Sequence, residues 1–275
     1  MARETARRIP PDWIFDEEMV KKSPSRIAGM TQDQEMTHLR QGISLIIDLG
    51  TLMKLKMNPT NAAACVFFQR FYMMHSIQEF PVYATACSCL FLAGKSEETP
   101  KKCRDVANAA LSSKFSSILP PRANLTNIML QEDIMGMERV ILQTIKFDFT
   151  VDLPYNYIIK YANNFKKQYD VNAARGVQHS LTREQYKDMV SELVRTAWTL
   201  VNDSFYTYLP LMWETQIIAV SLFWLAIKFK QEDQLNESRW WEDHVAELSS
   251  EKMESICHMV LDYYSSANPT AAQQT

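Results

Sequence analysis

ACSCLFLAGK at residues 86–95 and AVSLFWLAIK at residues 219–228 are the two stretches that decide the architecture of this chain. They share Ala, Ser, Leu, Ala and Lys at matching positions, at an offset of 133 residues (219 minus 86). Each is apolar nearly all round, which is typical of a central helix in a bundle. The repeat predicts that one helical unit occurs twice. The alternative is a chance similarity between two apolar helices.

Helical periodicity extends outward from both stretches, and strand-like alternation is nearly absent. The proline residues between the periodic segments are typical of helix ends and starts. The pattern predicts an all-α chain with two sets of five helices, in which each repeat stretch forms the third helix of its set. The expected helices cover residues 31–55, 60–78, 82–98, 101–111 and 126–147, and then 155–169, 182–205, 215–230, 239–247 and 250–266.

The domain limits follow from this pattern. The polar stretch 170–181 is expected to be a surface insertion within the second set, and the last residues are expected to be disordered because they are polar and lack periodicity. We expect an N-terminal extension at 1–30, a first unit at 31–148, an extended linker at 149–154, a second unit at 155–267 and a tail at 268–275.

The composition narrows the possible partners. The 275 residues carry 29 basic and 32 acidic side chains, a net charge of −3, so no overall positive field attracts nucleic acid. The longest apolar stretch, residues 217–227, is shorter than the roughly 20 residues that a bilayer requires. No apolar run follows the N-terminal arginines, so no secretory signal is predicted. We expect an intracellular protein with neither nucleic acid nor membrane as a direct partner.

Residue types that carry chemistry do not converge in this sequence. No glycine-rich phosphate loop and no HExxH pair is present, and His75 is interpreted as a core residue with its polar atoms satisfied. We therefore predict no catalytic residue, cofactor or metal. Trp240 and Trp241 are expected to hold a short helix against the core, the alternative being an aromatic recognition surface. Reduced, partly buried thiols are predicted for Cys65, Cys87, Cys89, Cys103 and Cys257.

Three stretches resemble the cyclin box in their order and spacing. They are FFQRFYMMHS at 67–76, CLFLAGKSEETPKKCRDV at 89–106 and MERVILQTIKFDFTVDLPY at 137–155. The runs AWTLVNDS at 197–204 and RWW at 239–241 are most similar to the transcriptional cyclins, closest to the cyclin K branch, with the cyclin T branch as near neighbour. The resemblance covers about residues 13–266 and implies tandem five-helix cyclin boxes with an N-terminal helical extension.

The resemblance implies a function as well as a fold. A transcriptional cyclin is a non-catalytic activating subunit that forms a heterodimer with a cyclin-dependent kinase in the nucleus. The expected kinase is twelve or thirteen, with nine as the alternative. Its expected substrate is the RNA polymerase II C-terminal domain, whose phosphorylation promotes transcription elongation. Cyclin K proteins often continue into a long Pro-rich tail, so these 275 residues are expected to be a short form or part of a longer chain.

The same resemblance places a kinase interface on five residues. Lys95 and Glu138 match the charged pair that hydrogen-bonds to kinase main chain around the αC helix. Glu98 lies on the same rim, and Leu142 and Phe147 match apolar contact positions. The alternative is that Lys95 and Glu138 simply pair with each other on the surface, which is worth only about 0–1 kcal/mol.

Helical spacing gives an independent expectation for the fifth helix of the first set. An apolar stripe of four residues is predicted to face the core, and Glu138 and Leu142 lie about 100° further round the helix. That adjacent face is expected to be free to meet a partner. The stripe consists of Ile134, Met137, Ile141 and Ile145.

Two sequence differences from the cell-cycle cyclins narrow the predicted function. The substrate-docking MRAIL motif is replaced by Leu39-Arg40-Gln41-Gly42-Ile43, so that docking function is expected to be absent. Ser96 stands where cell-cycle cyclins carry an aromatic residue, which disfavours cell-cycle kinases. The main rival function is a nucleic-acid-binding double cyclin fold resembling transcription factor IIB, which would need a basic face. A helical scaffold for some other partner is a further alternative.

Overall fold

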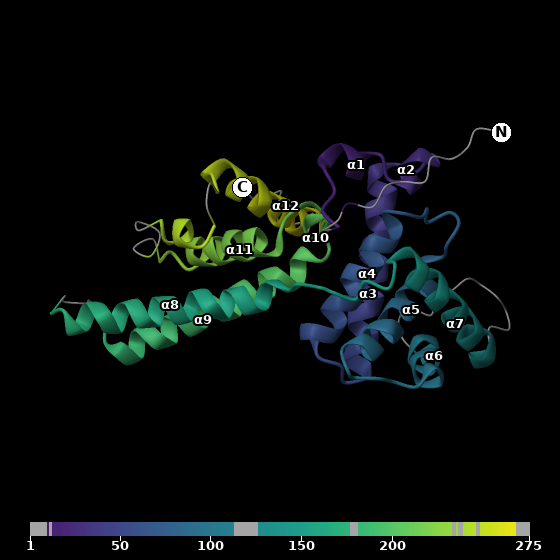
Figure 1. Cartoon of the computed structure of the whole chain (residues 1–275), viewed down its shortest axis with the longest axis horizontal. Coiled ribbons are helices and arrows are strands. Elements are labelled where there is room, and N and C mark those ends of the chain that lie inside the picture. Colours follow the sequence, from purple (N-terminus) through teal and green to yellow (C-terminus); the bar gives the residue numbers. More distant parts are fainter. Residues whose placement is uncertain are drawn as a thin grey trace. The chain divides into compact units, whose positions relative to one another are not determined.

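The computed structural model describes residues 10, 13–112, 126–176, 181–232, 235, 239–245 and 248–267. Within these residues the secondary structure is helical and contains no strand (Figure 1). The chain divides into two compact units, Met1–Val151 with Pro210–Met212, and Asp152–Leu209 with Trp213–Thr275. The expected class, an all-α chain of tandem helical units with an N-terminal helical extension, is confirmed, whereas the finer domain limits remain predictions.

The first unit is built around helix α5, in which every residue from Val82 to Gly94 is buried. Helices α3, α4, α6 and α7 all pack against it (Figure 1). This explains why the α5 sequence is apolar all round. The elements of the unit are α1 (Glu17–Lys21), α2 (Pro24–Ile27), α3 (Gln32–Leu52), the π-helical turn η1 (Met57–Asn61), α4 (Ala62–Tyr72), α5 (Val82–Ser96), α6 (Cys103–Ser112) and α7 (Asn127–Thr144).

The N-terminal extension is held to the first unit by buried polar contacts. Arg26 on α2 donates from Nε to Glu35 Oε2 on α3 at 2.7 Å, and Glu35 is buried. Trp13 donates from Nε1 to Asp148 Oδ2 at 3.1 Å, and its ring lies 5.1 Å from the Arg70 guanidinium. Because each charged group has an opposite charge or a donor, the extension packs without leaving a buried charge unpaired.

The second unit has α11 as its central helix, and α8, α9 and α12 pack against it. Buried residues of α11 run from Ile218 to Ile227, interrupted only at Trp224. The elements are α8 (Pro154–Ala174), α9 (Arg183–Ser204), α11 (Thr215–Phe229), the 3-10 turn η4 (Trp240–Asp243) and α12 (Ser250–Ala267). The short helix α10 (Leu209–Met212) belongs to the first unit from Pro210 onward.

The sequence repeat is a structural repeat. The bounds of α5, 82–96, shifted by 133 residues give 215–229, the bounds of α11. Ser88 donates to Ala84 O at 2.7 Å, and the matching Ser221 donates to Ile217 O at 2.9 Å. The correspondence therefore extends from helix length to the hydrogen bonds of the buried serines.

One helix is longer than predicted. The helix expected to end at 169 continues as α8 to Ala174, five residues into the expected surface insertion. Tyr169 stacks on Tyr186 of α9 with ring centroids 4.5 Å apart, and Asp170 accepts from Arg183 Nε at 2.8 Å. These contacts hold the polar end of α8 along the start of α9, so the helix continues although its apolar pattern has stopped. Residues 177–180 lie outside the described residues.

Two predicted helices are shorter. The helix expected at 60–78 ends at Tyr72, because the chain then turns and His75 packs between Phe71 and Phe80, with ring centroids 4.6 and 4.9 Å away. His75 Nε2 also lies 2.8 Å from Thr144 Oγ1, so the ring is hydrogen-bonded, but His75 is half-buried and not a core residue. The helix expected at 239–247 is a single 3-10 turn that follows Arg239 at φ 42°.

The tryptophans of that turn hold it to the core as predicted. Trp240 and Trp241 are both buried, and the Trp240 ring contacts those of Tyr161, Phe165 and Phe223 at centroid distances of 5.4 to 5.5 Å. Residues 246–247, and the tail expected to be disordered, lie outside the described residues. No helix in the described part of the chain combines the length and the apolar character needed to span a bilayer.

The cysteines carry no disulfide. Cys65, Cys87, Cys89 and Cys257 are buried and Cys103 is half-buried, which confirms the prediction of largely buried thiols. Burial raises the pKa of Cys87 and of Cys257 to about 12. These thiols therefore stay protonated at neutral pH and pack as small apolar groups.

Candidate functional site

The candidate site begins where α5 ends. Glu98 adopts a left-handed conformation with φ 54°, its N–H donates to Lys95 O at 3.4 Å, and the Thr99 N–H donates to Gly94 O at 2.8 Å. This pair of bonds is the Schellman arrangement that closes a helix end. A Cβ on Gly94 would lie 3.2 Å from Thr99 O, so the close return of the chain favours glycine there. Lys95 and Glu98 are thereby both held on one exposed rim.

An ion pair joins α5 to α7 at this rim. Lys95 Nζ donates to Glu138 Oε1 at 2.7 Å and to Oε2 at 2.9 Å. The Lys95 side chain is 46% exposed, whereas that of Glu138 is only 11% exposed. The pairing considered from the sequence as the alternative to an interface thus exists in the free chain. It does not exclude a partner, because a lysine ammonium has three donors.

The expectation that Glu138 lies on a face free to meet a partner is wrong. Glu138 is buried, in line with Leu130, Ile134 and Ile141 on the inner side of α7, while Met137 is only half-buried. A carboxylate is tolerated in that line because Lys95 supplies a cation at bonding distance. Periodicity within one helix predicts that a charged residue is exposed, because the pattern holds no information about a cation on another helix.

The Lys95 ammonium also lies over an aromatic ring that the sequence reasoning missed. Its Nζ is 4.0 Å from the centroid of Phe91, one turn earlier on α5. Contacts of this kind favour the cation by about 0.5–1 kcal/mol at exposed sites. The spacing of four residues between an aromatic and a lysine on one helix was the available signal. The ring and the carboxylate together hold the ammonium in place.

Cys103 at the start of α6 lies within the electrostatic influence of this pair. Burial raises the pKa of the Cys103 thiol, the Glu138 carboxylate raises it further and the Lys95 ammonium opposes the rise. The thiol Sγ lies 3.7 Å from Gln131 O, to which it donates. Cys103 therefore remains a neutral thiol and not a nucleophile.

Leu142 and Phe147 lie at the end of α7. Leu142 is half-buried, and its carbonyl accepts from the Phe147 N–H at 3.0 Å. Lys146 and Phe147 both adopt left-handed backbone conformations, with φ 54° and 57°. This second Schellman end turns the Phe147 side chain outward, where 61% of it is exposed. An aromatic held this far into solvent is suited to contact with another protein.

All five predicted residues lie on α5, on α7 or in the turn that ends each of these helices, within the first unit. Lys95, Glu98, Glu138, Leu142 and Phe147 are called the α5/α7 surface from here on. Met135, which the sequence reasoning missed, lies one turn before Glu138 on α7 and is 45% exposed. An apolar residue seven positions before Leu142, on the same side of the helix, was the available signal. The surface combines exposed apolar side chains with one preset cation.

The site offers recognition more than acid-base chemistry. Its buried carboxylate, Glu138, is already paired with a lysine, and the neighbouring Cys103 thiol is neutral. Among the described residues, no group of three His, Cys, Asp or Glu side chains is placed to hold a metal ion. Exposed aromatic side chains such as that of Phe147 are enriched in protein interfaces.

Comparison with known proteins places the chain in a family. The family model for the cyclin N-terminal domain matches residues 6–150. Human cyclin-K is 37% identical over 268 residues, covering 93% of this chain and 41% of the relative. Cyclin-K of Danio rerio is 36% identical over 277 residues, covering 96% and 58%. The chain thus spans between about two fifths and three fifths of the length of these two relatives.

Solved structures share the fold at low sequence identity. A chain of the CAK complex from Chaetomium thermophilum bound to ATP-gamma-S superposes with a TM-score of 0.66 at 16% identity, over 91% of this chain and 76% of that one. A chain of the yeast RNA Pol II CTD kinase CTDK-1 complex gives a TM-score of 0.58 at 15% identity, over 91% and 83%.

Proposed function

The chain belongs to the cyclin family, and from that premise we propose that it is the non-catalytic, activating subunit of a transcriptional cyclin-dependent kinase. The expected partner is kinase twelve or thirteen, with kinase nine as the alternative, in a nuclear heterodimer. The expected substrate is the RNA polymerase II C-terminal domain, and the expected outcome is transcription elongation. Similarity to cyclin-K over most of the chain supports this reading.

The observation that carries the proposal is the Lys95–Glu138 pair on the α5/α7 surface. Lys95 is half exposed and keeps a donor for a main-chain carbonyl of the kinase, and the buried Glu138 holds that ammonium in place. Phe147 and Leu142 supply apolar contact beside the pair. The kinase αC helix would dock here, moving inward so that its Glu pairs with the phosphate-positioning Lys of the kinase.

The energetic requirement on this surface is large. If about 1% of the free kinase is in an active conformation, raising that to about 99% requires roughly 5.5 kcal/mol of preferential binding. An interface of on the order of 1,600 Å² provides this binding energy only if few side chains and loops become ordered when the kinase binds. The buried α5 core and the two closed helix ends satisfy that condition, because they hold the contact residues before the kinase arrives.

The experiment compares charge-swapped pairs. The first variant carries Lys95→Glu with Glu138→Lys, and the control carries Asp170→Arg with Arg183→Asp, which swaps the exposed pair joining α8 to α9 at 2.8 Å. Each variant retains an opposite-charge pair, so a difference in kinase binding between the two variants does not come from the loss of an ion pair. Kinases are retrieved from nuclear extract and assayed on a polymerase C-terminal-domain peptide.

We expect the native chain and the control to retrieve an elongation kinase with activity on the peptide, and the Lys95/Glu138 swap to lose both. If the swap folds and activates as well as the native chain, the α5/α7 surface is not the interface. If the native chain retrieves no kinase, the kinase-activating function is wrong. Binding of the native chain to DNA that weakens steeply with salt would instead favour the nucleic-acid-binding rival.

A further inference from the structure

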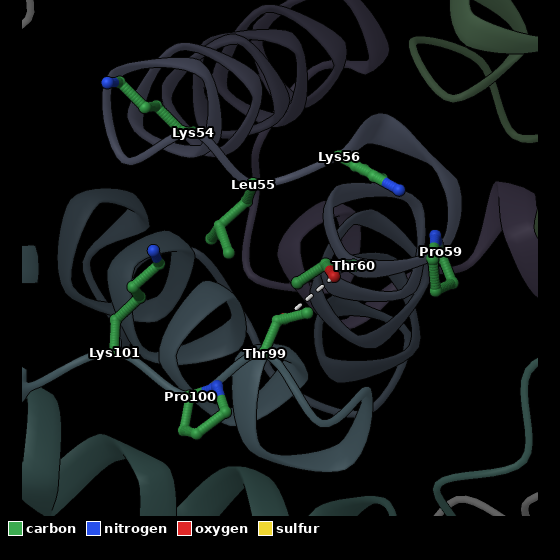
Figure 2. A pocket seen from close by; sticks show the side chains of 8 residues that line it. All are labelled: Lys54, Leu55, Lys56, Pro59, Thr60, Thr99, Pro100 and Lys101. Atoms are coloured by element: carbon green, nitrogen blue, oxygen red, sulfur yellow. Dashed lines mark hydrogen bonds between the residues drawn. The ribbon is translucent and has the colours of Figure 1, made fainter.

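A cavity of about 400 Å³ opens in the first unit (Figure 2). Its walls come from two segments that are distant in the sequence: the chain that leaves α3 and continues through the turn η1, and the chain that leaves α5. The volume lies within the range of about 300–1,000 Å³ that is usual for ligand sites. No residue of the α5/α7 surface lines it, although Thr99 in its wall directly follows Glu98.

The charged residues lining this cavity are all basic. Lys54, Lys56 and Lys101 line it, and no acidic side chain does. Within the described residues none of the three forms a salt bridge. Figure 2 shows Lys54 and Lys56 extending to opposite sides of the opening, with Lys101 below Lys54. Because the net charge of the chain is −3, this concentration of positive charge does not reflect the overall charge of the chain.

The interior of the cavity is partly polar and partly apolar. Thr60 Oγ1 and Thr99 Oγ1 lie 3.0 Å apart and share a hydrogen bond, and Thr60 is fully buried. Leu55, Pro59 and Pro100 complete the lining with apolar atoms (Figure 2). One hydroxyl hydrogen of the threonine pair is used within the pair, which leaves a second for an acceptor in the cavity.

We propose that this cavity binds a phosphorylated segment of a protein, with the phosphate beside Lys101 and the threonine pair and with Lys54 and Lys56 adding positive charge on the two sides of the opening. A phosphoserine or phosphothreonine carries about −1.5 to −2 charge at pH 7, and lysine binds phosphate as a mobile point charge. The cavity is larger than a phosphate group alone would fill, and its proline and leucine walls suit the adjoining peptide. Three lysines on an acidic chain are too few to hold an extended polyanion such as a nucleic acid or an anionic membrane.

This inference does not depend on the identity of the kinase. The two sites use different residues, so each can be removed without the other. The position of Thr99 next to Glu98 places the phosphopeptide beside the surface to which the kinase is proposed to bind. A partner or substrate already phosphorylated would then be held by the cyclin itself.

Fluorescence anisotropy with the full 275-residue chain tests the site directly. The probe is a labelled ten-residue peptide with one phosphoserine between neutral residues, compared with its unphosphorylated form. We expect saturable binding of the phosphorylated probe only, weakening as salt rises, since ion pairs with phosphate are screened. Lys54→Gln, Lys56→Gln and Lys101→Gln combined should weaken binding by roughly tenfold or more.

The matched control removes three lysines elsewhere. Lys160→Gln, Lys166→Gln and Lys167→Gln on α8 change the net charge by the same amount and should leave binding within about twofold, because no contact is lost. A second variant, Thr99→Val, keeps the shape and removes one hydroxyl, and should weaken binding severalfold. Thermal unfolding of each variant checks that the fold is intact.

Three outcomes would overturn the proposal. Equal loss in both triple variants would show a general charge effect. Equal affinity for the unphosphorylated probe would show that phosphate is not recognised. Tighter binding of single-stranded RNA or of phosphatidylserine vesicles than of the probe, lost in the Lys54, Lys56 and Lys101 variant, would assign the cavity to a different polyanion. None of these results bears on kinase activation, so the two proposals fail separately.

Discussion

The ammonium of Lys95 lies 2.7 and 2.9 Å from the two carboxylate oxygens of Glu138, so one half-exposed cation neutralises one buried anion across α5 and α7. The two side chains differ in burial, so removing one or the other should lower the free energy of unfolding by unequal amounts. A lysine left alone returns to water, whereas a carboxylate left alone stays buried. The pair is thus both a structural link between the helices and the charged centre of the α5/α7 surface.

This asymmetry gives the first prediction. Lys95→Met should lower the free energy of unfolding by about 1–3 kcal/mol at pH 7, since it leaves the Glu138 carboxylate buried without a cation. Glu138→Gln should cost less, because the freed Lys95 regains hydration. Urea unfolding of both single variants and of the double variant measures the coupling. If the losses of unfolding free energy in the two single variants were equal and added up to the loss in the double variant, the ion pair would contribute no coupling energy.

The second prediction concerns the repeat-related residues Glu98 and Gln231. Both follow a central helix and adopt left-handed backbone, with φ 54° and 57°, which costs a side-chain-bearing residue about 1–2 kcal/mol. Glu98→Gly and Gln231→Gly should each raise stability or leave it unchanged in thermal unfolding. Only Glu98→Gly should weaken kinase binding. Equal kinase binding by both variants would remove Glu98 from the proposed interface.

Glycines of helices α3 and α7 give the third prediction. A Cβ on Gly42 would lie 2.1 Å from the ring of buried Phe68, whereas a Cβ on Gly136 would meet nothing within 4 Å. Gly42→Ala should therefore destabilise the chain by about 1–3 kcal/mol. Gly136→Ala should stabilise it by up to about 1 kcal/mol, because alanine favours a helix interior. Chemical denaturation measures the free energy of unfolding of both variants. Equal changes of the same sign would contradict the packing of α3 on α4.

The fourth prediction is a pH dependence from His75. Thr144 Oγ1 donates to Val140 O at 2.8 Å, so it accepts from His75 Nε2–H, and the neutral ring is satisfied. Burial lowers the pKa of His75, with Glu79 opposing the shift. As pH falls, His75 therefore takes up a proton in the unfolded chain before it does so in the folded chain. The contribution of His75 to stability is full above about pH 6.5 and decreases as pH falls toward the folded-state pKa.

His75→Gln tests this sign, with the exposed His258→Gln as its control. The melting-temperature difference between the native chain and His75→Gln should shrink as pH falls from 7.5 to 5.5, because only the native chain loses the contribution of a neutral His75. His258→Gln should follow the native chain across the range. A difference that stays constant with pH would mean that His75 contributes by packing alone.

Much of the fold was predictable from local pattern. The apolar character of residues 86–95 and 219–228 predicted two central helices, and α5 and α11 are those helices, of equal length. The threonine predicted to start the fifth helix caps α7, where Thr126 accepts from the Met129 N–H. Caps and periodicity act within a few residues, which is why a linear sequence carries them.

Two of the differences between prediction and structure have one cause in common. Sequence pattern places Glu138 on a free face and ends α8 at 169, because local periodicity treats a polar stretch as exposed. Lys95, 43 residues away, makes the burial of Glu138 possible, and Arg183 and Tyr186 hold the polar end of α8. In each case the partner comes from another helix.

The linear sequence was enough to predict the helical class, the duplicated central helix, the cyclin resemblance and the five candidate interface residues. The pairing of Lys95 with Glu138, the exposure of Phe147, and the position of Lys54, Lys56 and Lys101 around one cavity are seen only in the folded chain. The difference lies in the range of the interactions. Helix propensity and capping depend on neighbours within one turn, whereas burial of a charge and the shape of a cavity depend on side chains that folding brings together from distant segments.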